Sequence, residues 1–118
     1  MSRRNRSWPS YLTEKSAPWA PSADVYRTRG GWLLKFDLAG VRLEDVTVSV
    51  RGRQVSVRGI RRDSLIEEGC SYYAMEISYN RFERSIEMPA NLEKASVSLE
   101  ARDGFLLVRV ITEGNQYV

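Results

Sequence analysis

From residue 23 onward, apolar and polar side chains alternate with a period of two, the pattern of a half-buried β-strand. In the run VTVSV, residues 46–50, the valines face one way and Thr47 and Ser49 the other. Similar runs occur at residues 23–27, 31–38, 54–58, 73–77, 82–88, 96–101 and 105–111, the last of them apolar on nearly both faces. No stretch keeps a helical period over about ten residues. About eight short strands without a covering helix must cover each other, so the pattern predicts an all-β antiparallel sandwich.

The turn residues agree with this prediction. Asp103-Gly104 separates two alternating runs and is a strong hairpin signal, because glycine accepts the positive φ of a tight turn. Gly52-Arg53 and Gly30-Gly31 predict two further hairpins, and Pro89 ends the run before it because it has no N–H for a ladder. Residues 59–78 form the exception: a long, charged connection with its own strand-like run, YAMEI. A connection of this kind is usually a functional loop.

The residues that are missing exclude most catalytic chemistry. The chain has no histidine and a single cysteine, Cys70, which excludes histidine acid–base catalysis, zinc sites built from Cys and His, and an intrachain disulfide. Neither a phosphate-binding P-loop nor a dinucleotide-binding glycine motif is present. The acidic pairs Glu44-Asp45 and Glu67-Glu68 lie in turn-like polar stretches, which favours solvated loop charge over catalytic carboxylates. We expect a protein that is not an enzyme and needs no cofactor or metal.

The expected cellular location rests on the absence of membrane-spanning and export signals in the sequence. No apolar run approaches the roughly 18 residues of a membrane span, and no apolar segment follows the basic start MSRRNRSWPSYL. We therefore expect a cytoplasmic protein. Because disulfides are rare in that compartment, we interpret Cys70 as a plain small residue of the loop rather than as part of an intersubunit disulfide.

The positive charge is confined to the first residues. Residues 1–22 hold four basic residues and one acidic residue, a net charge of +3 (4 − 1), whereas residues 23–118 hold 14 of each sign. Aromatic and apolar residues are interspersed there: Trp8, Tyr11, Leu12 and Trp19. Such an arm could bind nucleic acid, but the neutral body offers no basic stripe to extend the contact, so a disordered interaction arm is the favoured interpretation.

One residue breaks the pattern of the strand at 82–88. Arg84 shares a face with Phe82, Ile86 and Met88, and a guanidinium on an apolar face must reach water or find a carboxylate. From the strand alone, an arginine whose stem packs on Phe82 and whose head reaches solvent is the simpler reading.

Four segments carry a resemblance to a known family. APSADVYR, DLAGV, EISYNRFERSIEMP and LEARDGFL occur in this order and resemble the α-crystallin domain of small heat-shock proteins of the bacterial and plant type, over roughly residues 18–111. Ala39 stands where the family prefers Pro, Asn80 where it prefers Gly, and Leu99 and Asp103 where it prefers Ala and Asn. The resemblance implies an immunoglobulin-like sandwich of seven to eight strands at residues 23–111, an arm at 1–22 and a short tail at 112–118. It also implies an ATP-independent chaperone, or holdase, that binds unfolding proteins and suppresses their aggregation.

The same resemblance implies a homodimer formed by strand exchange. The strand within loop 59–78 would cross to the partner's sheet, and Arg84 would lie near the interface, with Glu76 as its carboxylate. The residues expected at this interface are Arg84, Glu76, Tyr73, Met75 and Phe82. With the resemblance, the paired arginine becomes the favoured interpretation over the solvent-reaching one.

Assembly beyond the dimer is expected to differ from the family pattern. An edge groove with walls at Val46, Val48, Val50, Val97 and Leu99 is expected, but the tail TEGNQYV lacks the Ile-x-Ile or Ile-x-Val motif that fills it in relatives. Either Tyr117 and Val118 dock weakly, or the groove stays free for other partners. The arm residues Trp8, Tyr11, Leu12 and Trp19 would then contact clients or link dimers into larger oligomers.

Two rival functions stay open at this level. A CS-domain co-chaperone shares the sandwich and binds a folded partner without exchanging a loop. A sandwich that binds nucleic acid through its basic arm would show binding that weakens steeply with salt. The run at 73–77 and the segment RFERS favour the small heat-shock interpretation over both.

Overall fold

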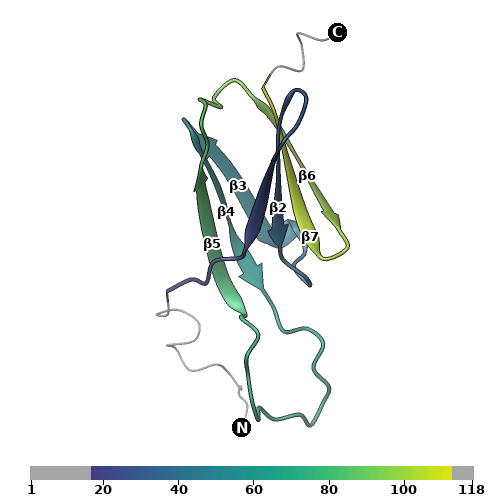
Figure 1. Ribbon diagram of the computed structural model, residues 1–118. Helices are drawn as coiled ribbons and strands as arrows, with labels where there is room; N and C mark the ends of the chain where they lie inside the picture. The colour runs from purple at the N-terminus through teal and green to yellow at the C-terminus, as the bar shows by residue number, and fades with distance from the viewer. Residues whose placement is uncertain (1–16, 113–118) are drawn as a thin grey trace.

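The computed structural model describes residues 17–112 of the chain. Its described part contains seven strands and one 3-10 turn, shown in Figure 1. In chain order these are β1 (Ala23–Arg27), β2 (Gly31–Asp37), η1 (Leu43–Asp45), β3 (Val46–Arg51), β4 (Gln54–Arg61), β5 (Asn80–Glu87), β6 (Ser96–Arg102) and β7 (Phe105–Ile111). Each predicted run except 73–77 is a strand.

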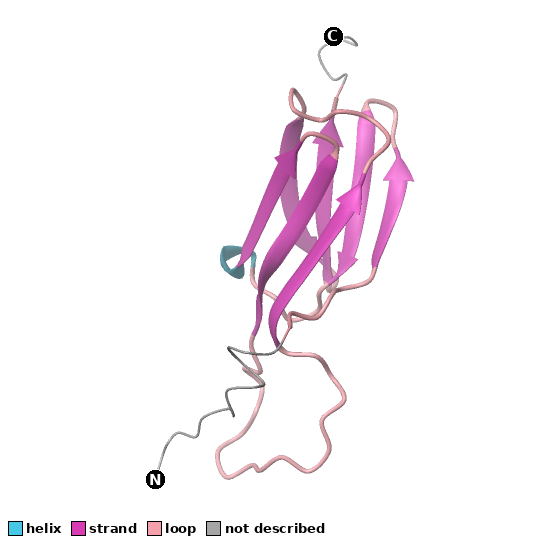
Figure 2. Cartoon of the chain, turned by 90° about the vertical axis from the view of Figure 1, so that its left-hand side faces the viewer, coloured by secondary structure: helices cyan, strands magenta, loops and turns pink. Residues whose placement is uncertain are grey.

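The strands form two antiparallel sheets packed face to face, as Figures 1 and 2 show. One sheet has the order β1-β2-β7-β6 and the other the order β3-β4-β5. Every pairing is antiparallel, and β4 with β5 is the longest ladder, from Gln54↔Glu87 to Arg61↔Asn80. The predicted all-β sandwich is confirmed.

The expected eighth strand is absent from the described chain. Residues 73–77 are all exposed and lie in an irregular loop that projects beyond the sandwich between β4 and β5 (Figures 1 and 2). A strand needs a neighbour for its ladder hydrogen bonds, and the projecting segment has no sheet beside it within one chain. The alternation of apolar and polar residues in the sequence does not reveal whether a pairing partner is present.

The core is one layer of side chains between the sheets. Most of it is supplied by the alternating apolar positions of β2, β4, β5 and β7. Its buried members are Leu34, Phe36, Leu38, Val55, Val57, Phe82, Met88, Leu92, Leu106, Val108 and Val110. The described residues contain no buried polar or charged side chain, so apolar burial supplies the main driving force of the fold.

Left-handed backbone conformations occur where the sequence supplies residues that tolerate them. Asp103 and Gly104 have φ of 55° and 84° in the β6–β7 turn, and Gly52 has φ of 63° in the β3–β4 turn. Asn80, which stands at a position where the family prefers glycine, has φ of 70° at the start of β5. Asparagine tolerates this region better than most residues, so the substitution preserves the entry into β5.

Gly59 allows the close contact between β4 and its surroundings. A Cβ at this position would lie 2.2 Å from the carbonyl oxygen of Asp45 and 2.9 Å from the ring of Phe82. Both distances are shorter than van der Waals contact, so the backbone or the ring would have to move. Because the ring of Phe82 is only 1% exposed, it has little room to give way.

We predict that Gly59→Ala destabilises the domain by about 1–3 kcal/mol, the cost typical of overpacking a core. Thermal unfolding followed by circular dichroism will measure the loss as a lower Tm. Ser49→Ala on the exposed face of β3 is the control and should change Tm little. Equal melting of Gly59→Ala and the unmodified chain would show that the neighbourhood of Phe82 is loosely packed.

Candidate functional site

The loop that leaves the sandwich exposes apolar side chains. Tyr73 is fully exposed, Leu65 is 93% exposed and Ile77 is 63% exposed. Ile66, Tyr72 and Met75 are also exposed. An apolar surface of this extent on a projecting loop is typical of a segment that another protein surface covers.

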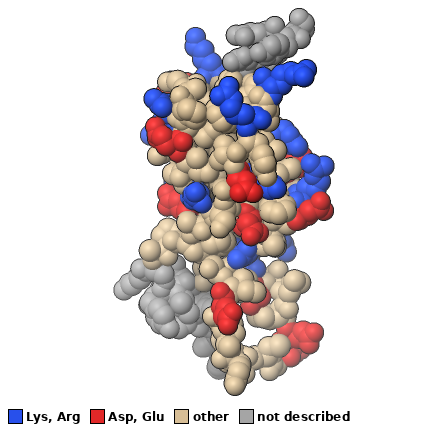
Figure 3. All heavy atoms as spheres, viewed as in Figure 1, with Lys and Arg blue, Asp and Glu red and all other residues tan. Residues whose placement is uncertain are grey.

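The loop also carries carboxylates. Figure 3 shows acidic side chains on the projecting loop, while basic side chains gather toward the opposite end of the molecule. Glu67, Glu68 and Glu76 are the exposed glutamates of the loop. The loop is therefore amphipathic, and a partner surface that covers it must offer apolar area together with positive charge.

Of the predicted interface residues, the structure places three on this loop and two in β5. Tyr73, Met75 and Glu76 are exposed on the loop. Phe82, in contrast, is a core residue at 1% exposure within one chain. Its ring lies close to Gly59 and packs against Trp19, with the two ring centroids 5.4 Å apart, and its contact with a partner stays a prediction.

Arg84 has a partner that the sequence did not reveal. Its Nη1 donates a hydrogen bond of 2.9 Å to the backbone carbonyl of Pro21, in the segment that leads into β1. Among the described residues no ion pair joins Arg84 to Glu76. The guanidinium is half-buried, and a neutral carbonyl does not compensate its charge.

The outer edge of β1 presents backbone groups that no strand of the described residues pairs with. The amide of Asp37 donates to the carbonyl of Ser22, and the amide of Thr28 donates to the carbonyl of Gly31, both at 2.9 Å. Because ladder bonds alternate along an antiparallel pair, the N–H and C=O groups of Ala23, Val25 and Arg27 point away from β2. Since β1 is the outermost strand of its sheet, these groups can accept another strand.

The base of the loop is closed by one arginine, which the sequence analysis did not single out. Arg61, the last residue of β4, donates from Nε to the carbonyl of Ser78 at 2.9 Å and from Nη1 to the carbonyl of Ala39 at 3.2 Å. Its guanidinium carbon lies 4.4 Å from the ring centroid of Trp19 and 5.8 Å from that of Tyr79. Two consecutive arginines at the start of a polar loop look like solvated charge, so the sequence held no signal for this role.

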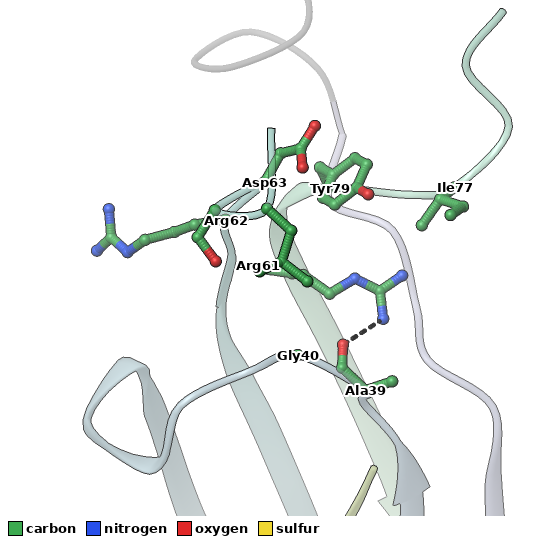
Figure 4. A pocket seen from close by; sticks show the side chains of 9 residues that line it. Ala39, Gly40, Arg61, Arg62, Asp63, Ile77 and Tyr79 are labelled. Atoms are coloured by element: carbon green, nitrogen blue, oxygen red, sulfur yellow. Dashed lines mark hydrogen bonds between the residues drawn. The ribbon is translucent and has the colours of Figure 1, made fainter. Parts of the chain in front are cut away.

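A cavity of about 270 Å³ lies beside Arg61. Figure 4 shows the guanidinium directed toward Ala39, with Tyr79 and Ile77 on the returning limb of the loop. The lining residues are Ala39, Gly40, Arg61, Arg62, Asp63, Ser64, Leu65, Ile77 and Tyr79. None of them forms a nucleophile–base pair, and the described residues contain no cluster of three or more metal-ligating side chains. The cavity is a structural feature of the loop base and shows no catalytic arrangement.

The outgoing limb of the loop is tied to η1. Arg62 donates from Nε and Nη2 to the two carboxylate oxygens of Asp45, at 3.1 and 3.2 Å. These hydrogen bonds lower the pKa of Asp45 and raise the pKa of Arg62. The pair therefore adds stability at neutral pH that is lost as pH falls through the lowered pKa of the carboxyl. Its exposure to water keeps the gain small.

The expected groove residues lie on two edge strands in different sheets. Val46, Val48 and Val50 of β3 are half-buried and pack against the core. Val97 and Leu99 of β6 pair with the buried Val110 and Val108, but they are 40% and 38% exposed. The structure thus leaves apolar area uncovered on β6, and a groove that docks a ligand stays a prediction.

The residues of the arm divide between described and undescribed parts. Trp8, Tyr11 and Leu12 lie outside the described residues. Trp19 forms a parallel bridge with Phe82: its amide donates to the carbonyl of Arg81 at 3.2 Å, and its carbonyl accepts from Glu83 at 2.9 Å. In this chain Trp19 therefore covers the edge of β5 rather than extending from the domain. Cys70 is an exposed free thiol on the loop.

Two further observations concern membranes and fold relatives. No helix of the described residues is long and apolar enough to cross a membrane. Among solved structures, the fold is similar to hspA from Xanthomonas axonopodis, with a TM-score of 0.67, 24% identity and coverage of 81% of this chain and 96% of that one. It is also similar to a small heat-shock protein from Xylella fastidiosa, with a TM-score of 0.65, 21% identity and coverage of 82% and 89%. These likenesses establish the fold.

Sequence comparison identifies the family. Small heat shock protein C2 of Rickettsia felis is 26% identical over 86% of this chain and 64% of its own length. The 17.8 kDa class II heat shock protein of Zea mays is 31% identical over 86% of this chain and 62% of its own length. The chain thus spans about three fifths of the length of the curated relatives it matches. The family model described as "Hsp20/alpha crystallin family" matches residues 24–117. With this match and with the sandwich that the structure shows, the chain belongs to the Hsp20/alpha crystallin family.

Proposed function

We propose that this chain is an ATP-independent holdase, which binds partly unfolded proteins and suppresses their aggregation. Its family consists of small heat-shock proteins, which are chaperones rather than enzymes. The observation that carries the proposal is the set of exposed apolar side chains on the projecting loop and on β6, held by a well-packed core. An unfolding protein also exposes apolar surface, and a partner that covers it keeps it from aggregating without using a nucleotide.

The chain acts as a homodimer formed by strand exchange. Residues 73–77 of one chain add to the free edge of β1 in the partner, which supplies the ladder that this run lacks within one chain. Two features support the pairing. The loop run alternates Tyr73, Met75 and Ile77 with smaller or polar residues, and Val25 on β1 is 41% exposed. Exchange would cover both at once.

At this interface, Arg84 of each subunit forms an ion pair with Glu76 of the other subunit. The half-buried guanidinium, held by the neutral carbonyl of Pro21, and the exposed carboxylate on the exchanging loop have complementary charges. A pair of this kind fixes the register and orientation of the exchanged strand more than it adds stability.

The N-terminal arm supplies client contacts and links dimers into larger oligomers. Trp8, Tyr11 and Leu12 provide the adaptable apolar side chains for both roles, and clients compete with neighbouring subunits for them. The cytoplasm is the proposed location, which is consistent with an exposed free thiol at Cys70.

We predict that the protein suppresses heat- or reductant-driven aggregation of client proteins without any nucleotide. Light scattering of several clients, with the chaperone added at amounts equal to the client, will measure it. Adding ATP should make no difference. Unchanged aggregation across all clients would contradict the holdase and favour an adaptor that binds a folded partner.

We predict that Arg84→Glu weakens the dimer at least about tenfold in Kd, because it places two like charges at the interface. Combining Arg84→Glu with Glu76→Arg should recover most of the loss, since the charges are exchanged. Analytical ultracentrifugation gives the Kd values, and far-UV circular dichroism checks that the sheets remain.

Arg58→Glu is the matched control for this test. It makes the same change at an exposed position of β4 and should leave the Kd within about twofold. If Arg84→Glu associates as tightly as the unmodified chain, or if Glu76→Arg gives no recovery, the proposed pair does not exist.

A further inference from the structure

A single side chain, that of Arg61, connects four segments that are far apart in the sequence. It lies at the end of β4 and donates to the returning limb of the loop at Ser78 and to the β2–η1 connection at Ala39. Its planar guanidinium also stacks near the rings of Trp19 and Tyr79. Two directed hydrogen bonds and a stacking face make this a contact that lysine cannot reproduce.

Trp19 lies between the guanidinium of Arg61 and the ring of Phe82. Its indole Nε1 donates a hydrogen bond to the carbonyl of Asn80 at 3.4 Å. Its backbone bonds to both neighbours of Phe82 in β5, Arg81 and Glu83. The segment that enters the domain from the N-terminal arm is thereby fixed at the same point where the loop returns to β5.

This shared point lies where the loop leaves the sandwich. Figures 1 and 2 show the loop projecting from the ends of β4 and β5, next to the segment that precedes β1. Arg61 anchors the returning limb at Ser78 and Tyr79, which directly follow Ile77, whereas Arg62 anchors the outgoing limb through Asp45. Loss of the Arg61 contacts would therefore free the limb that carries residues 73–77.

We propose that Arg61 is a clamp between the N-terminal arm and the exchanging loop, so that displacement of Trp19 releases the loop. The inference rests on the proposed function, in which the loop builds the dimer and the arm binds clients. A client that pulls the arm away from Phe82 removes the ring on which Arg61 stacks. The returning limb then loses a support, and strand exchange weakens.

The coupling works in both directions because linkage between two contacts is reciprocal. A loop held by the partner's β1 keeps Ser78 and Tyr79 in place, and these keep Arg61 over Trp19. Dimer formation therefore holds the arm against the domain, and arm displacement favours dissociation. The structure thus points to the segment at Trp19 as the place where client loading is sensed.

Cys70 provides a readout that needs no added residue. It is the only cysteine, it is exposed, and it lies on the loop, so a nitroxide spin label attached to it reports loop motion in the full chain. The electron paramagnetic resonance spectrum gives the ratio of mobile to immobile label. Light scattering on the same labelled sample gives the molar mass.

Arg61→Lys keeps the charge but loses the stacking face and the two-donor geometry, and Trp19→Leu keeps apolar packing on Phe82 but removes the ring beneath the guanidinium. Each should raise the mobile-to-immobile ratio about tenfold. The double variant should raise it no further than either single variant, because both act through one contact. Arg58→Lys, the same change at an exposed position of β4, is the control and should change the ratio less than about twofold.

The outcomes separate the clamp from the dimer. An unchanged ratio in Arg61→Lys, or an equal change in Arg58→Lys, would overturn the clamp. A change in Arg61→Lys without one in Trp19→Leu would overturn the coupling to the arm. If the unmodified chain runs as a monomer, the dimer proposal fails, whereas the spectra still decide whether Arg61 and Trp19 act together on the loop.

Discussion

A strand at the edge of a sheet needs cover for one row of backbone N–H and C=O groups, and a sandwich of two open sheets has four such edges. Here the outermost strands are β1 and β6 in one sheet and β3 and β5 in the other. The segment around Trp19 covers part of the β5 edge through two backbone hydrogen bonds. The edge of β1 keeps its outward groups at Ala23, Val25 and Arg27. The proposed dimer uses this free edge of β1.

The same constraint explains why the loop is long and apolar. A connection from β4 to β5 that only closed a hairpin could be a few polar residues. This one spans residues 62–79 and exposes Tyr73, Met75 and Ile77, which are costly to leave in water. In the proposed account these residues are exposed within one chain because their cover belongs to the partner. Apolar area on the loop, on β6 and on the arm would then serve both assembly and client binding.

Sequence periodicity predicted the parts of this protein that depend on local chemistry. The alternating runs marked all seven strands, and Asn80, Asp103 and Gly52 marked positions where the backbone is left-handed. What it missed depends on three-dimensional contact. The alternation placed Phe82 on an apolar face but gave no sign that Trp19 packs against it, and the carbonyl of Pro21 that binds Arg84 lies 63 residues away in the chain. Arg61 gave no signal, because two of its partners are backbone carbonyls, which carry no mark in a sequence, and the other two are aromatic rings far from it in the chain or across the loop.

Backbone hydrogen exchange at β1 tests the central claim, the exchange of strands between subunits, most directly. The outward amides of Val25 and Arg27 should exchange slowly at concentrations where the dimer forms and faster on dilution, because the partner's residues 73–77 accept their hydrogen bonds. The inward amides of Asp24 and Tyr26, which bond to β2, should stay protected at every concentration. Rapid exchange at Val25 and Arg27 in a sample that light scattering shows to be dimeric would contradict the account, since the dimer would then leave the edge of β1 open.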